Sequence, residues 1–377
     1  MKRSKSIAVS TMIMSFMLMF GSVPVMGASD SSTGNSDLNA LISKAKDENP
    51  SLALYDKKIA ISKIAAARAD DPADDETDYQ KEMRLKVNPD RRDLELENLQ
   101  WDRDVEEESV VLDTKKYYYQ SIIDDKLIEI QNNKIARLSK AIEDKKLGIQ
   151  VGTEAETSLI NDQVNLSSAE TTLLQLKNDK QDNSMKLNLN IDSSVSADHT
   201  FQMVDVPYEE YTVKDINGLA EDMSEDYHSI KSMKKELHLD IVEEGIAKDY
   251  DDGKNMLERA AYPNTDYKSY AETLSDTITN LEYTIDDEKR NINAKVRTDY
   301  NNILNLNNSV QDKQLEYQQA LIQYNSEKAK LDVGMSTQSK CDEARENLDT
   351  AQWAYNQAKL DYLVSVEQFK IYVEDVI

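Results

Sequence analysis

The stretch VQDKQLEYQQALIQYNSEKAKLDVGMSTQSKCDEARENL, residues 310–348, decides the fold because two apolar repeats meet in it at a break. The first repeat places an apolar residue at every seventh position: Val310, Tyr317, Tyr324 and Leu331. Such spacing keeps one face of a helix against a partner in a left-handed coiled coil. Val333 and Gly334 follow, and glycine accepts the left-handed backbone conformation that ends many helices. The stretch therefore predicts a hairpin of two long helices that turns at Gly334.

The repeat continues outward on both sides of this stretch. Val296 and Ile303 extend it toward the N-terminus, with the same spacing. A second set begins after the break: Cys341, Leu348, Tyr355, Tyr362 and Phe369. Cys341 is the single cysteine, which excludes an internal disulfide, and its place on the seam predicts a buried apolar role.

The hairpin occurs twice in the chain. A shift of 182 residues places Val151 and Gly152 under Val333 and Gly334. The same shift aligns the seam of an earlier pair of helices: Ile128, Ile135, Ile142 and Ile149, then Leu159, Leu166 and Leu173. Similarity at a fixed period indicates a tandem duplication. We therefore expect an all-α fold of long antiparallel coiled-coil hairpins in two tandem repeats, with little or no β-strand.

The expected organisation is one elongated domain: a leader over 1–28, a flexible start over 29–36, a first repeat over 37–205 and a second over 206–377. Within it we expect helices over 37–69 (interrupted near Pro50), 94–149, 154–189, 213–248, from 267 to about 331, and from there to the C-terminus. Acidic connections are expected over 70–93 and 249–266, and a short strand over 201–204 in the join between repeats.

Charge and leader narrow the function classes. The net charge of −26 argues against nucleic acid, whose phosphates require a basic surface. Lys2, Arg3 and Lys5 precede an apolar run over 7–20, as in a secretory signal peptide. No later stretch has the roughly 20 apolar residues of a spanning helix. The sequence therefore predicts an exported protein without a helical membrane anchor.

No motif indicates catalysis, a cofactor or a metal. His199, His228 and His238 are scattered and do not combine with a cysteine cluster into a transition-metal site. The sequence also lacks a glycine-rich phosphate loop and a nucleophile elbow. We expect no enzyme activity and no cofactor.

Several segments together resemble the TolC-like outer membrane efflux family. They lie in the first helix, the long helix of each repeat and both turns: NPSLAL (49–54), LDTKKYYY (112–119), KLGIQVGT (146–153), VRTDYNN (296–302) and KLDVGMS (330–336). Each is weak alone, but their order and double occurrence are moderately specific, and the likeness covers nearly all of the chain after the leader.

The resemblance implies a protomer of an α-helical barrel, in which three copies form an exit duct in the cell envelope. An adaptor of the membrane-fusion type and an inner-membrane pump would feed this duct, making the chain a passive component of efflux or type I secretion. The resemblance places adaptor docking at the hairpin turns: Val151, Gly152, Thr153, Val333, Gly334, Met335 and Ser336. Neighbouring acids would favour cations at a narrowed pore mouth: Glu154, Glu156, Asp332 and Asp342.

The sequence departs from the family in one respect. The family inserts a pair of membrane-barrel strands into each repeat, and such strands need about 9–11 residues of alternating polarity. The segments 70–93 and 249–266 occupy those places, and stretches such as ADDPADDETD (69–78) cannot face lipid. The sequence therefore predicts a member without the family's outer-membrane anchor: either a reduced member from an envelope with no outer membrane, or a protein that another component holds at the outer membrane. The rival function is a coiled-coil scaffold or spacer of the envelope that forms no channel.

Overall fold

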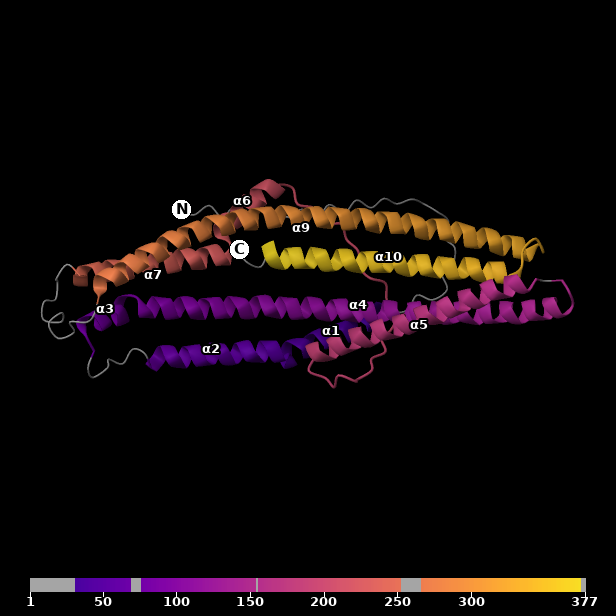
Figure 1. The fold of residues 1–377 in the computed structure, drawn as a ribbon, viewed down its shortest axis with the longest axis horizontal. Coiled ribbons are helices and arrows are strands. Elements are labelled where there is room, and N and C mark those ends of the chain that lie inside the picture. Colours follow the sequence, from indigo (N-terminus) through magenta and orange to yellow (C-terminus); the bar gives the residue numbers. More distant parts are fainter. Residues whose placement is uncertain (1–30, 69–75, 154, 252–265, 374–377) are drawn as a thin grey trace. The chain divides into compact units, whose positions relative to one another are not determined.

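The computed structural model describes residues 31–68, 76–153, 155–251 and 266–373. These residues form long helices with no strand among them, so the all-α prediction is confirmed. The helices, labelled as in Figure 1, are α1 (Ser31–Glu48), α2 (Pro50–Arg68), α3 (Asp78–Lys86), α4 (Asn88–Gln150), α5 (Glu156–Asn190), α6 (Ile216–Asp226), α7 (His228–Asp251), α9 (Tyr267–Asp332) and α10 (Gln338–Val373). The predicted leader lies outside the described residues. The helix α1 begins within the segment predicted to be a flexible start.

Each repeat contains the same helix break. The chain bends at Asn49 between α1 and α2, as the proline at position 50 predicts, and again at Tyr227 between α6 and α7. Tyr227 takes an extended conformation with φ −60° and ψ 147°, although no proline follows it. The second break, which the sequence analysis missed, is fixed by packing: the Tyr227 ring lies 4.8 Å from that of Tyr372 and 5.9 Å from that of Trp101.

Two predictions about the connecting segments were wrong. Residues 201–204 form no strand, because no second strand lies beside them; Phe201 instead packs its ring 4.8 Å from that of Tyr118. The predicted connection over 70–93 contains α3 and the start of α4. Thr77 and Gln80 begin α3 with a capping box, in which each side chain accepts a hydrogen bond from the other residue's backbone N–H. The rest of this segment (70–75) and most of the second connection (252–265) lie outside the described residues.

The described residues divide into two compact units, each with segments from both repeats: those within 31–49, 110–212 and 302–367 in unit 1, and those within 50–109, 213–301 and 368–373 in unit 2. Contacts between neighbours order four helices of unit 1, which also contains α1, in a row: α5, α4, α10, α9. Neighbours are joined by Lys145–Asp162 between α4 and α5 (2.5 Å), Arg137–Glu346 between α4 and α10 (2.7 Å), and Tyr317–Tyr355 between α9 and α10 (ring centroids 6.4 Å apart). The helices α5 and α9 are thus the two edges of the row.

The core of unit 1 is built by the seam and by the join between repeats. Val310 and Ile303 of the heptad repeat are fully buried, and Cys341 is buried as predicted. A cluster around Tyr118 and Trp353 brings the joining segment onto the helices; its buried members are Leu38, Tyr118, Tyr119, Ile122, Ile123, Val206, Trp353 and Leu360. The join is therefore packed structure without regular hydrogen bonding.

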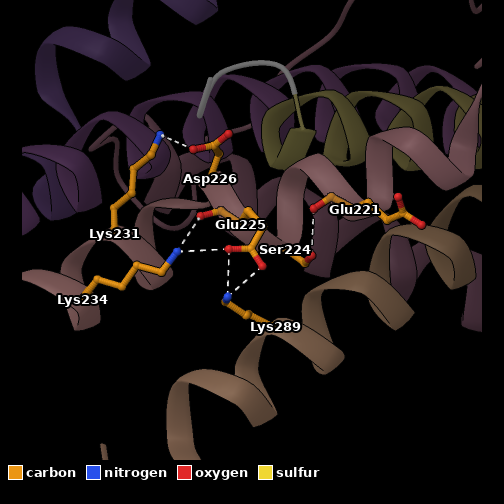
Figure 2. A network of polar contacts seen from close by, with 7 residues as sticks. All are labelled: Glu221, Ser224, Glu225, Asp226, Lys231, Lys234 and Lys289. Atoms are coloured by element: carbon orange, nitrogen blue, oxygen red, sulfur yellow. Dashed lines mark hydrogen bonds and ion pairs between the residues drawn. The ribbon is translucent and has the colours of Figure 1, made fainter. Parts of the chain in front are cut away.

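Unit 2 is also a row of helices, in the order α2, α4, α7, α9. Its polar centre is the partly exposed Arg91 of α4, whose guanidinium lies 2.7 Å from Asp240, 2.8 Å from Glu243 and 3.2 Å from Glu236 of α7. Figure 2 shows a second, exposed network in this unit, at the end of α6. Glu225 accepts hydrogen bonds from Lys234 of α7 (3.1 Å) and Lys289 of α9 (2.7 Å), and these bonds lower the pKa of its carboxyl. The exposed network joins three helices beside the break at Tyr227.

Candidate docking site at the hairpin turns

Both hairpins end in the same backbone geometry. Gly152 and Gly334 have φ of 77° and 73°, the left-handed conformation predicted for them. In the first turn the Gly152 N–H donates to the Ile149 carbonyl (3.0 Å) and the Thr153 N–H to the Gly148 carbonyl (2.9 Å). These two bonds define a Schellman motif, in which the residue with positive φ and the one after it satisfy carbonyls of the last helical turn.

The second turn repeats these bonds. The Gly334 N–H donates to the Leu331 carbonyl (2.9 Å) and the Met335 N–H to the Lys330 carbonyl (2.8 Å). Ser336 adds a side-chain bond from its hydroxyl to the Glu327 carboxylate (2.8 Å). The two turns are thus rigid helix ends whose backbone groups are satisfied internally, so partner binding would use their side chains.

Those side chains are exposed and apolar. Val151 is 74% exposed, Val333 69% and Met335 79%. Side chains with this exposure bury little apolar surface within the fold. Exposed apolar side chains at the end of each hairpin suit contact with a protein partner. The structure therefore presents the predicted turn residues to solvent, while their docking role stays a prediction.

A cleft of about 1020 Å³ lies beside the turns, between the end of α4 and the start of α10 in unit 1. Arg137 crosses it to Glu346, with its Nε and Nη2 at 2.7 and 2.8 Å from the two carboxylate oxygens. These bonds raise the pKa of Arg137. Burial raises the pKa of Asp349 at the far end of the cleft. The cleft mixes charges, with Lys140 and Arg345 lining it beside the acids.

The four acids predicted for a pore mouth have different surroundings. Asp342 lines the cleft and accepts a hydrogen bond from Gln338 (2.8 Å). Glu156 and Asp332 are exposed beside the turns and do not line the cleft, and Glu154 lies outside the described residues. The pore-mouth role of the four acids stays a prediction.

Sequence analysis missed two features of this region. The Arg137–Glu346 bridge joins the two repeats across 209 residues, and no local pattern indicates such a pairing. The second feature is a stripe of exposed, uncharged residues on each of α5 and α9, which could have been found by examining positions spaced three and four apart away from the heptad seam.

Comparison with known proteins places this arrangement in a class of fold. No family model and no curated protein matches the sequence. Solved structures do match: CusC, in a study of folding and transmembrane channel formation, has a TM-score of 0.61 at 10% identity, over 90% of this chain and 92% of its own. The CmeC outer membrane channel of Campylobacter jejuni gives 0.61 at 11% identity, over 95% and 90%. The open MtrE outer membrane channel of Neisseria gonorrhoeae gives 0.56 at 11% identity, over 89% and 88%.

The fold is that of a long helical hairpin protein. More particularly, it is the fold of the TolC-family outer membrane channels, as the sequence motifs predicted. Among the described residues, no helix combines the length and apolar character needed to cross a membrane.

Proposed function

We propose that this protein is the passive exit-duct component of an efflux or secretion assembly in the cell envelope, and that three copies line the duct. The number three and the envelope location are proposed from the resemblance to the TolC-like family. The observation that carries the proposal is in unit 1: the row of four helices ends in α5 and α9, and each of these helices exposes an uncharged stripe that a neighbouring copy could cover. The join bonds to α9 near its middle, where Tyr208 donates to Asn307 (2.6 Å).

Each edge helix has one stripe of exposed, uncharged residues, in a chain of which 31% of residues are charged. Exposed charges lie beside these stripes, among them Glu170 and Lys177 on α5 and Asp312 and Glu316 on α9. The uncharged stripe of α5 consists of exposed residues spaced three and four apart: Thr157, Ile160, Val164, Ser167, Thr171, Leu174, Asn178 and Gln181. That of α9 consists of Leu304, Asn308, Gln311, Leu315, Gln318, Ile322, Ser326 and Ala329. Outer faces of solvated helices are normally charged. A second, equally acidic copy can approach these two faces without burying like charges.

The two faces also meet at matching heights. Antiparallel helices rise equally, by about 1.5 Å per residue, so contacts between neighbours fix their relative heights. The contacts Lys145–Asp162, Arg137–Glu346 and Tyr317–Tyr355 fix the heights of α5, α4, α10 and α9 relative to one another. Counting residues from these contacts puts Leu174 of α5 level with Ile322 of α9. The two side chains are 62% and 69% exposed. Copies related by a rotation axis stand at the same height, so these two side chains would meet in a closed ring.

This assembly is tested by crosslinking. In a Cys341→Ala background, Leu174→Cys and Ile322→Cys are made in separate chains and the chain without its leader is purified. We expect disulfide-linked dimers only when the two variants are mixed, together with a light-scattering mass of three protomers and ion conductance after reconstitution. A rod of monomer mass without conductance would instead support the rival function, an envelope scaffold.

The exposed turn residues supply a second prediction, on docking. We expect Val333→Asp together with Met335→Asp to abolish co-purification with the adaptor and export of the pump's substrates. Melting temperature and oligomer mass should be unchanged, because surface substitutions usually alter stability by less than about 0.5 kcal/mol. The control is Leu85→Asp in α3, where leucine is 60% exposed and far along the chain from both turns. Normal adaptor binding by the double variant would contradict the docking role.

A further inference from the structure

Unit 2 also has two edge helices, but their charges are opposite. The helix α2 carries Lys57, Lys58, Lys63 and Arg68 against the single acid Asp56, in a protein whose net charge is −26. The part of α9 that belongs to unit 2 exposes more acids than bases: Glu272, Asp276, Glu282, Asp286 and Asp287 against Lys268, Arg290 and Lys295. Arg290 pairs with Asp287 within the helix, so Asp286 is the acid beside Tyr283 that Arg290 does not pair with. One chain therefore has a basic edge and an acidic edge within the same unit.

Each edge also exposes apolar surface at its centre. On α2, Leu54 is 52% exposed, Ile61 67% and Ile64 53%, and Lys57 and Lys58 lie one turn before Ile61. On α9, Tyr283 is 71% exposed, and Asp286 and Asp287 lie one turn beyond it. An aromatic ring beside acids faces outward on one edge, and an aliphatic patch beside lysines faces outward on the other.

Contacts across the row bring these two centres to one height. Asp56 of α2 lies 3.2 Å from Arg103 of α4, and Ser229 of α7 donates to Glu288 of α9 at 3.2 Å. The ion pair Glu97–Lys235 joins α4 to the antiparallel α7. Arg103 lies six residues after Glu97 on α4, and Ser229 lies six residues before Lys235 on α7. Arg103 and Ser229 are therefore also at one height. Asp56 and Glu288 therefore stand at the same height.

The helices α2 and α9 run in opposite directions. Ile61, five residues after Asp56, and Tyr283, five residues before Glu288, are therefore displaced the same way along the helix axes and also stand at one height. Lys58 of α2 is then level with Asp286 of α9. The helices α2 and α9 of one chain are separated by α4 and α7, so the residues cannot meet within a protomer. At 8–10 Å between neighbouring axes, the separation is about 25 Å.

We infer that α2 is a docking surface for α9 of a second copy of this chain, with Tyr283 against Leu54, Ile61 and Ile64, and with Lys58 paired to Asp286. The inference rests on the proposed assembly from copies and adds its chemistry: the contact in unit 1 is uncharged, whereas this one is electrostatic. A head-to-tail contact between unlike surfaces closes into a ring under rotation. Complementary charges also exclude the reversed pairing, which would place α9 acids against α9 acids.

The first test is a charge reversal with a matched control. Lys58→Glu should lower the association constant of the leaderless chain by at least about tenfold, because like charges then face each other. Lys63→Glu makes the same charge change on the opposite face of α2, and it should leave association unchanged. Adding Asp286→Lys to Lys58→Glu should restore association, and added salt should weaken the wild-type contact. Thermal melts check that all variants fold alike.

The second test is direct. In a Cys341→Ala background, Ile61→Cys and Tyr283→Cys in separate chains should form a disulfide only when mixed, since a disulfide needs Cα atoms within about 7 Å. A wild-type chain that assembles while Lys58→Glu assembles equally well overturns this contact and leaves the proposed duct standing. A wild-type chain that stays monomeric overturns both. The leaderless chain is also mixed with anionic phospholipid vesicles. If the wild type binds them, and Lys58→Glu loses this binding without a change in assembly, the basic edge contacts a membrane surface instead.

Discussion

Replacing Arg91 with Met is expected to destabilise the protein by about 2–3 kcal/mol at pH 8. The guanidinium compensates two carboxylates that have little access to water: Asp240 is 9% and Glu243 6% exposed at the side chain. Removing one partner of a buried ion pair typically costs about 3–5 kcal/mol, and the exposure of Arg91 itself reduces this figure. Denaturant unfolding followed by circular dichroism measures the loss.

The loss should shrink as pH falls. Burial already raises the pKa of Asp240, and Arg91 is the group that opposes this rise. Without Arg91, Asp240 binds a proton more tightly in the folded state than in the unfolded state. The stability of the variant therefore increases as pH falls from about 8 toward the pKa of an unfolded aspartate, near 4. The control is Arg103→Met, whose partners Asp56, Asp104 and Glu107 are 61%, 76% and 23% exposed, all more than Asp240 and Glu243. It should cost less than about 1 kcal/mol. Equal losses in the two variants, or a loss independent of pH, would contradict the central role of Arg91.

The second large effect is expected at the turn of the C-terminal hairpin. Gly334→Val should destabilise the protein by about 2 kcal/mol, because the left-handed conformation costs a residue with a Cβ roughly 1–2 kcal/mol and a β-branched one more. Space is not the obstacle, since a Cβ built on Gly334 meets no atom within 4 Å. The whole penalty therefore comes from the backbone φ of 73°.

The matched control for this variant is Gly245→Val. Gly245 lies inside α7, and a Cβ there also meets no atom within 4 Å. Valine forms helices somewhat better than glycine, so this variant should be unchanged or slightly more stable. Gly334→Asn should lie between the two, because asparagine tolerates the left-handed conformation. If Gly334→Val melts at the same temperature as Gly245→Val, the turn does not depend on the glycine.

How far the sequence predicts this structure can be judged from particular residues. The seam from Val296 to Phe369 follows from a period of seven, and all of its members are buried or half-buried. The turn at Gly334 follows from the end of that period and from the special conformation of glycine. Both are local properties, since they concern residues a few positions apart. The predicted strand at 201–204 failed because a strand needs a partner, which local sequence does not supply.

The sequence by itself therefore determined the helices, their pairing into two hairpins and the place where each hairpin turns, because periodicity and glycine conformation act over short distances along the chain. Tertiary structure alone decided which helices are edges, and it brought Arg137 to Glu346 and Arg91 to Asp240. It also decided that Ile61 and Tyr283 stand at one height on opposite edges. These relations depend on how separate helices are ordered and levelled, and a repeating pattern along one helix carries no information about its height beside another.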